Sequence, residues 1–137
     1  MVTTRTVAQR IASECLGRRA RLLSRVVTRL FDEELRDHEL KGSQLTLLVA
    51  LALSPGVRPS QLAEGLAMDK STLSRNLSRL EARGWVASAT GLELTAEGES
   101  VLQDAYPAWK RAQKRIAERL GSAGVDALAG LGSELGA

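Results

Sequence analysis

The chain has 137 residues, of which 44% are hydrophobic and 26% charged, and its 19 basic and 16 acidic side chains give a net charge of +3. This length and composition fit one soluble globular domain, and the mild basic excess permits nucleic-acid binding without arguing for it. One cysteine, Cys15, excludes an internal disulfide framework. With one histidine, His38, the chain also lacks the ligands for a His and Cys metal site.

Targeting and catalytic signals are also missing. The longest purely apolar run, residues 47–53, is far shorter than the roughly 18 residues of a membrane span. The first residues lead into no apolar signal-peptide core. No glycine-rich phosphate loop and no catalytic constellation stands out. We therefore expect a cytoplasmic protein that is not an enzyme, has no cofactor or metal and binds no membrane.

The first element predicted is a helical segment over about residues 6–40, with a break or bend near Gly17. Its apolar residues recur at helical spacings of four and three. These residues are Leu16, Ala20, Leu23, Val27 and Leu30. We expect this stripe, with a similar one formed by Val101, Ala112, Ile116 and Leu120, to be the seam of a dimer.

Two short helices and a capped one follow in the middle of the chain. Residues 44–53 predict an almost wholly apolar, buried helix. Pro59 suits the first position of a helix over 59–66. Asp69 is a good N-cap for a helix over 70–83, and Gly84 should end that helix as the residue after it.

A small hairpin and a long helix complete the chain. Residues 85–87 and 92–94 predict two strands around a turn at Thr90 and Gly91. Thr95 should cap a helix that runs to about residue 120 and is disturbed at Pro107. A break at 121–124 and a final short helix follow.

The helix over 59–66, the three-residue connection and the helix over 70–83 have helix-turn-helix spacing, and the hairpin after them would be a wing. Polar residues on a helix usually mean a solvated face, but such faces favour Glu and Lys, whereas here Ser, Thr, Asn and Arg predominate. Small hydroxyls permit close approach to base edges, Asn pairs with adenine, and Arg pairs with guanine. The positions expected to face outward are Ser71, Thr72, Ser74, Arg75, Asn76, Ser78 and Arg79.

Several runs in the chain resemble MarR-type transcriptional regulators. The most specific part covers residues 59–98, and the resemblance extends from about residue 18 to residue 120. The runs that carry it are residues 35–40, 44–48, 59–63, 68–75, 80–86 and 94–98. The fold implied is mainly α with a small β-hairpin wing, that is, a winged helix-turn-helix plus terminal dimerisation helices.

The resemblance implies a homodimeric repressor that binds double-stranded DNA in successive major grooves and responds to a small-molecule effector. Within the single domain 1–137, residues 1–40 and 96–137 would dimerise and residues 41–95 would form the DNA-binding lobe. Recognition-helix positions match Ser71, Thr72, Ser74, Arg75, Asn76 and Arg79, and phosphate-contacting positions match Ser60, Gln61 and Lys70. We expect Lys70, Arg75, Arg79 and Arg83 to neutralise most of the phosphates.

The wing departs from the family pattern, because its tip, residues 88–91, carries no basic residue. Minor-groove insertion of a cation is therefore not expected. This short, uncharged wing also motivates an alternative function, a winged-helix protein-interaction module without DNA binding. A gel shift with a salt series separates the two.

Cys15 leaves two interpretations open. Some regulators of this family sense oxidants through a lone cysteine in this region, and nearby Arg18 and Arg19 would favour the thiolate that this chemistry needs. A lone cysteine is more often a small packing residue, and Glu14 opposes the thiolate. We weight packing above a redox sensor.

Overall fold

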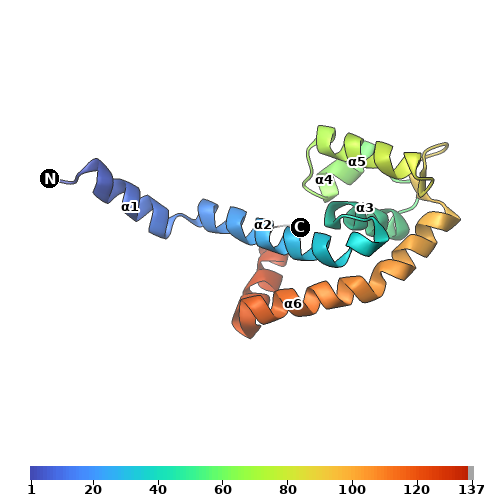
Figure 1. Cartoon of the computed structure of the whole chain (residues 1–137). Helices are drawn as coiled ribbons and strands as arrows, with labels where there is room; N and C mark the ends of the chain where they lie inside the picture. The colour runs from blue at the N-terminus through green and yellow to red at the C-terminus, as the bar shows by residue number, and fades with distance from the viewer. Residues whose placement is uncertain (136–137) are drawn as a thin grey trace.

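The computed structural model describes residues 1–135 and is mainly helical, with one two-stranded antiparallel hairpin between α5 and α6 (Figure 1). This confirms the predicted fold class. The elements in chain order are α1 (Thr4–Glu14), α2 (Leu16–Glu34), the 3₁₀ turn η1 (Arg36–His38), α3 (Gly42–Leu53), α4 (Pro59–Gly65), α5 (Lys70–Ala82), β1 (Val86–Ala87), β2 (Glu93–Leu94) and α6 (Ala96–Glu134). Within the described residues, no helix is long and apolar enough to cross a membrane.

The N-terminal segment is helical as predicted and is interrupted near the predicted place, so that it forms two helices, α1 and α2, and the short turn η1. The break lies at Cys15, where ψ is 111°, two residues before the predicted bend at Gly17. Side chains satisfy carbonyls that the end of α1 leaves free: Arg18 donates to the Ala12 carbonyl at 3.4 Å and Arg19 to the Ser13 carbonyl at 2.5 Å. As a result, α1 projects from the body of the molecule as an arm (Figure 1).

The hydrophobic core lies where α3, α5, the hairpin and the first half of α6 meet. Its largest fully buried side chains are Leu35, Leu47, Leu48, Leu51 and Leu80. The predicted burial of α3 is confirmed along most of its length. Its leucines lie on several faces of the helix, and α2, α5, α6 and the hairpin cover them. This core sets the position of α5, the helix on which the functional argument rests.

Helices α2 and α6 pack against each other within the same chain, and this packing uses part of the two apolar stripes predicted for a dimer seam. Leu30, Ala112 and Ile116 belong to the two predicted stripes and are buried within this chain. Ion pairs reinforce the contact: Glu34 accepts from Arg111 at 3.0 Å and from Arg115 at 3.1 Å. The hydrogen bond from Arg111, followed by that from Arg115, lowers the pKa of Glu34. Part of each stripe is therefore buried within one chain, whereas Leu16 at the start of α2 stays 76% exposed.

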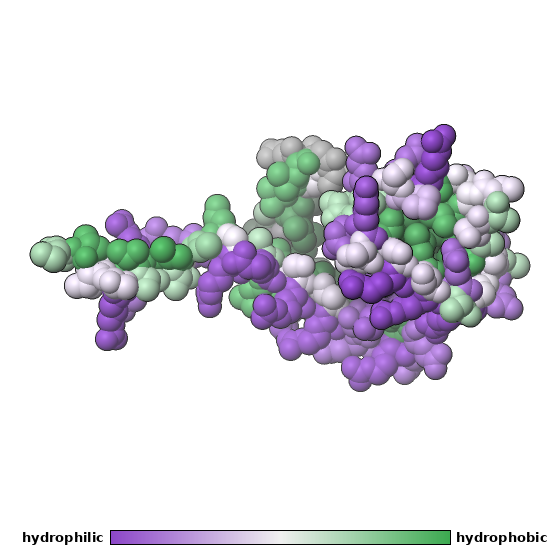
Figure 2. All heavy atoms as spheres, turned by 90° about the horizontal axis from the view of Figure 1, so that it is seen from above, coloured by the Kyte–Doolittle hydropathy of each residue, from purple (hydrophilic) through white to green (hydrophobic). Residues whose placement is uncertain are grey.

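Other apolar side chains remain exposed at the two ends of the chain. A hydrophobic stripe runs along the α1 arm, and another marks the last part of α6 (Figure 2). The exposed residues near the N-terminus are Val2, Val7, Ile11 and Leu16. Those near the C-terminus are Val125, Leu128, Leu131 and Leu135. The last part of α6 changes direction at Gly121, whose φ of 70° suits glycine, and this residue alone forms the predicted break at 121–124. The helix continues through Pro107.

Candidate nucleic-acid interface

Helices α4 and α5 form the predicted helix-turn-helix. Pro59 begins α4, and the Gln61 side chain closes its first turn by accepting the Arg58 N–H at 3.3 Å. Leu62 and Ala63 are buried and fix α4 to the core. Two predicted phosphate contacts, Ser60 and Gln61, lie exposed at the start of this helix.

Asp69 caps α5 with three hydrogen bonds, which confirms the predicted cap. Its carboxylate accepts from the Thr72 N–H at 2.8 Å, the Ser71 hydroxyl at 2.7 Å and the Thr72 hydroxyl at 2.8 Å. These bonds, the Thr72 N–H first, lower the pKa of Asp69 to about 2. The cap is therefore ionised at neutral pH and holds both hydroxyl side chains in place.

The outward face of α5 carries most of the predicted DNA contacts. The exposed side chains are those of Lys70, Ser71, Ser74, Arg75, Ser78 and Arg79, and Thr72 is half-buried. Arg75 leans toward the start of the helix, with Nη2 3.4 Å from the Thr72 hydroxyl oxygen. Asn76 corrects the prediction: it is only 6% exposed, because it follows Leu73 by three residues and precedes Leu80 by four, at the edge of the buried face.

The hairpin after α5 has the position of a wing. Val86 pairs with Leu94 and Ala87 with Glu93, while Val57 forms a bridge to Leu92. Gly91 has a φ of 126°, and a Cβ there would lie 2.7 Å from the Gly56 carbonyl oxygen, so this close crossing requires glycine. The tip, residues 88–90, is exposed and carries no charge.

Arg58 is a candidate site residue that sequence reasoning missed. It is exposed, immediately follows the Val57 bridge to the wing, and precedes α4. A basic residue directly before a helix-turn-helix was the available signal. It supplies a positive charge beside a wing that has none at its tip.

Arg83 does not belong to the exposed basic face, contrary to the prediction for it. Its guanidinium lies over the Trp85 ring at 3.7 Å, and its Nη2 is 3.3 Å from a Glu39 carboxylate oxygen. Nη1 donates to the Glu39 carbonyl. The basic side chains left on the outward face of α5 are Lys70, Arg75 and Arg79.

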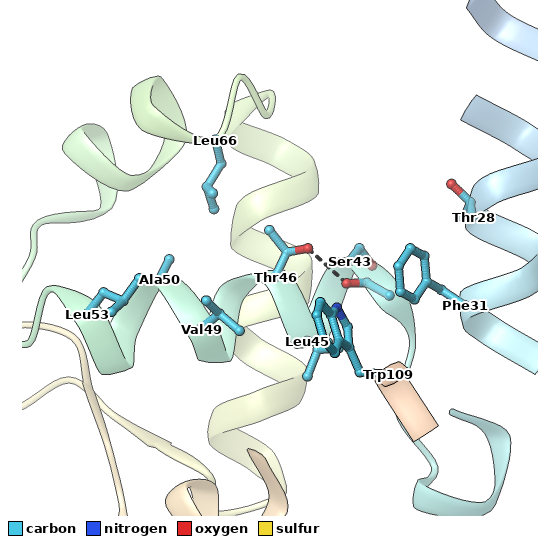
Figure 3. Close-up of a pocket in the computed structure, with 11 residues that line it drawn as sticks. Thr28, Phe31, Ser43, Leu45, Thr46, Val49, Ala50, Leu53, Leu66 and Trp109 are labelled. Atoms are coloured by element: carbon cyan, nitrogen blue, oxygen red, sulfur yellow. Dashed lines mark hydrogen bonds between the residues drawn. The ribbon is translucent and has the colours of Figure 1, made fainter. Parts of the chain in front are cut away.

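A cavity of about 570 Å³ lies between α2, α3 and α6 (Figure 3). Phe31 and Trp109 form its aromatic walls, and Leu45 and Val49 line it from α3. Thr46 contributes a hydroxyl that donates to the Gly42 carbonyl at 3.0 Å. A mostly apolar space of this size with a few hydroxyls is typical of a small-molecule site.

Cys15 lies half-buried at the break between α1 and α2. The Arg18 backbone N–H is the largest of the influences that lower its pKa, and Arg21 contributes through its charge. The surroundings thus favour the thiolate, although through backbone groups more than through the side chains of Arg18 and Arg19.

Comparison with known proteins agrees with this geometry. A sequence profile described as the MarR family matches residues 38–91. The Mycobacterium tuberculosis transcriptional regulator MosR is 29% identical, with 89% of this chain and 96% of that chain covered and a TM-score of 0.77. CouR, a transcriptional repressor bound to p-coumaroyl-CoA, is 26% identical, with coverages of 92% and 94% and a TM-score of 0.81.

A third solved structure supports the fold alone. A mutant MarR from Escherichia coli complexed with operator DNA is 22% identical, with 91% of this chain and 96% of that chain covered and a TM-score of 0.78. A search of curated protein sequences finds no significant match.

A capped recognition helix, its partner helix and a hairpin wing define a winged helix-turn-helix protein. Together with the profile match over residues 38–91 and the structural matches, they show that the chain is similar to MarR-type winged-helix regulators.

Proposed function

We propose that the chain is a homodimeric, sequence-specific DNA-binding transcriptional regulator of the cytoplasm that acts as a repressor and performs no catalysis. The observation that carries this proposal is the outward face of α5. It combines a fixed N-terminal cap with exposed hydroxyl and arginine side chains, and no acidic residue occurs between Asp69 and Glu81. Such a face suits the negative potential and the hydrogen-bonding edges of the major groove.

Each candidate residue has a proposed role that follows from its place. Arg75, near the start of α5, would read a base edge together with Ser71, Thr72 and Ser74. Arg79, one turn later, would contact a phosphate. Ser60, Gln61 and Lys70 would also contact phosphates, and Arg58 joins them because it is exposed beside the wing.

The proposed domain organisation assigns residues 41–95 to the DNA-binding lobe and residues 1–40 and 96–137 to dimerisation. The exposed apolar side chains of α1 and of the last part of α6 support this division, since a monomer would leave them in water. Sedimentation should give a dimer at micromolar concentration, and a stable monomer would contradict the assignment.

The cavity beside Phe31 and Trp109 is the proposed site of a small-molecule effector with an aromatic or other apolar body. It borders α2 and α6, the scaffold, as well as α3, which packs against α5. Occupation could therefore shift the lobe relative to the scaffold. Quenching of Trp109 fluorescence by small aromatic acids, with a Trp109→Phe control, tests this site.

An oxidant is a second candidate signal, because the pKa of the half-buried Cys15 is lowered. Hydrogen peroxide would transfer one oxygen to the thiolate, giving a sulfenic acid and releasing hydroxide. If Cys15 is the sensor, peroxide should weaken DNA binding by the wild type and leave the Cys15→Ser variant unchanged. Equal responses would mean that Cys15 serves packing.

The decisive experiment measures binding to DNA. Fluorescence anisotropy with the DNA upstream of the chain's own coding sequence, and with duplexes selected from a random pool, is repeated over a salt series. We expect selection of a sequence with two half-sites and an affinity that falls steeply with salt. Failure to enrich any sequence would favour the alternative, a winged-helix protein-interaction module.

A further inference from the structure

The Arg83 side chain connects three parts of the molecule. Arg83 is the C-cap residue directly after α5. Its side chain stacks on Trp85 where the wing begins and reaches Glu39, which lies 44 positions earlier in the turn after η1. The guanidinium donates to both the carbonyl and the carboxylate of Glu39. A planar group with several fixed donors is well suited to such a triple contact.

This connection has no counterpart elsewhere on the recognition helix. Among residues 1–135, the other side chains of 69–83 with hydrogen bonds are Asp69, Ser71, Thr72 and Arg75, and all of those bonds remain within that segment. The remaining attachment of α5 to α3, α4 and β1 is apolar packing through residues such as Leu73, Leu77 and Leu80. Arg83 therefore supplies the directional contact between α5 and the α2–η1 segment.

The carbonyl of Glu39 is the more important of the two acceptors. The Glu39 side chain is 84% exposed, so its carboxylate contributes little in water. Its backbone is held in the left-handed region, with a φ of 52°, and its N–H donates to the Arg36 carbonyl at 2.9 Å. The turn thus presents its carbonyl to α5 in a fixed place, shortly after the buried Leu35 that anchors η1 in the core.

We propose that Arg83 is a positioning residue for DNA recognition, which fixes the angle of α5 and the wing relative to the α2–α6 scaffold. This proposal rests on the proposed DNA-binding function. In a dimer, that angle determines the distance and rotation between the two recognition helices, and hence the half-site spacing that both can occupy.

Two other roles for Arg83 make different predictions. A phosphate contact would be lost with the positive charge, and the salt slope of the dimer would fall by about 1.8 units. A contribution to folding alone would lower the melting temperature and leave the spacing preference intact. A positioning role alters the spacing preference while the salt slope stays the same.

The test uses full-length protein and the two-half-site duplex that the wild type selects from a random pool. Probes with one base pair added or removed between the half-sites turn one half-site by about 35° relative to the other. Affinity for each probe is measured over a salt series for the wild type, Arg83→Met and Arg83→Lys. Glu39→Gln is the matched control, because it removes the carboxylate charge and keeps the carbonyl. Circular dichroism checks the folding of each variant.

We expect Arg83→Met and Arg83→Lys to bind the selected duplex about tenfold more weakly, as for the loss of one charge-assisted hydrogen bond. They should also discriminate less between the three spacings, with a wild-type salt slope, and Glu39→Gln should resemble the wild type. Unchanged spacing discrimination in folded Arg83→Lys overturns the proposal, as does a lower salt slope in Arg83→Met. If the wild type selects no duplex, the proposed function itself fails.

Discussion

Replacing Gly98 with alanine tests whether the start of α6 packs closely against the backbone of Trp85, the residue before the wing. The Gly98 Cβ would lie 2.1 Å from the Trp85 carbonyl oxygen, whereas nonbonded carbon and oxygen atoms normally stay at least about 3.3 Å apart. The helix must therefore move by about an ångström. That movement also strains the hydrogen bond from the Thr95 N–H to the same carbonyl, now 3.0 Å long.

The expected cost combines two effects. Overpacking costs about 1–3 kcal/mol, and a weakened hydrogen bond adds about 1 kcal/mol, so Gly98→Ala should lose roughly 2–4 kcal/mol of unfolding free energy. For a chain of this size the melting temperature should fall by roughly 10 °C. Gly65→Ala is the matched control, because nothing lies within 4 Å of the Cβ it would add to α4.

Urea denaturation at one fixed protein concentration measures both variants, since the stability of a dimer depends on concentration. We expect Gly65→Ala to stay within about 1 kcal/mol of the wild type. If Gly98→Ala were as stable as Gly65→Ala, the close contact between α6 and Trp85 would not exist in solution.

Three further predictions concern the interface. Arg75→Ala should cost about 1–3 kcal/mol of DNA binding and relax sequence preference, whereas Arg79→Ala should lower the salt slope by about one unit per contact; anisotropy titrations in which both variants match the wild type would refute the recognition-helix assignment. Thr90→Arg should tighten binding and steepen the salt slope, because it places a cation at the exposed wing tip; no change in either quantity would mean that the hairpin faces away from DNA. Asp69 has its pKa lowered to about 2 from 3.8, so its ionised form stabilises the fold above pH 3.8 and this contribution is lost as the pH falls toward 2. The difference in urea midpoint between wild type and Asp69→Asn should therefore be constant above about pH 5 and shrink below pH 4, and a difference independent of pH would count against the cap.

Local signals in the sequence predicted the centre of the fold well. Asp69 and Thr95 cap their helices as expected, and Gly84 ends α5 with a φ of 78°. These signals are reliable because a cap or a left-handed glycine depends on a few neighbouring residues. The hairpin followed from them, since it occupies the short interval between Gly84 and Thr95.

Predictions that required distant partners were less successful. The spacing of the stripes on α2 and α6 predicts apolar contact, but it cannot distinguish a partner in the same chain from one in another copy, and Leu30, Ala112 and Ile116 are buried within this chain. The polar type of Asn76 predicts an outward position, although its spacing from Leu73 and Leu80 puts it at the edge of the buried face. Arg83 is predicted to contact DNA because Lys70, Arg75 and Arg79 lie close to it in the sequence. No local signal reveals its contact with Glu39, 44 positions away.

The cap on α5 also determines what kind of base this end of the helix can recognise. A serine or threonine hydroxyl has one hydrogen to donate, and Ser71 and Thr72 both give theirs to the Asp69 carboxylate. Toward DNA these hydroxyls can act only as acceptors, so they match neither a phosphate oxygen nor the N7 and O6 atoms of guanine. The groups in the major groove that can donate to them are the amino groups of adenine and cytosine. We therefore expect operators of this regulator to place adenine or cytosine opposite the start of α5 and to keep guanine for Arg75.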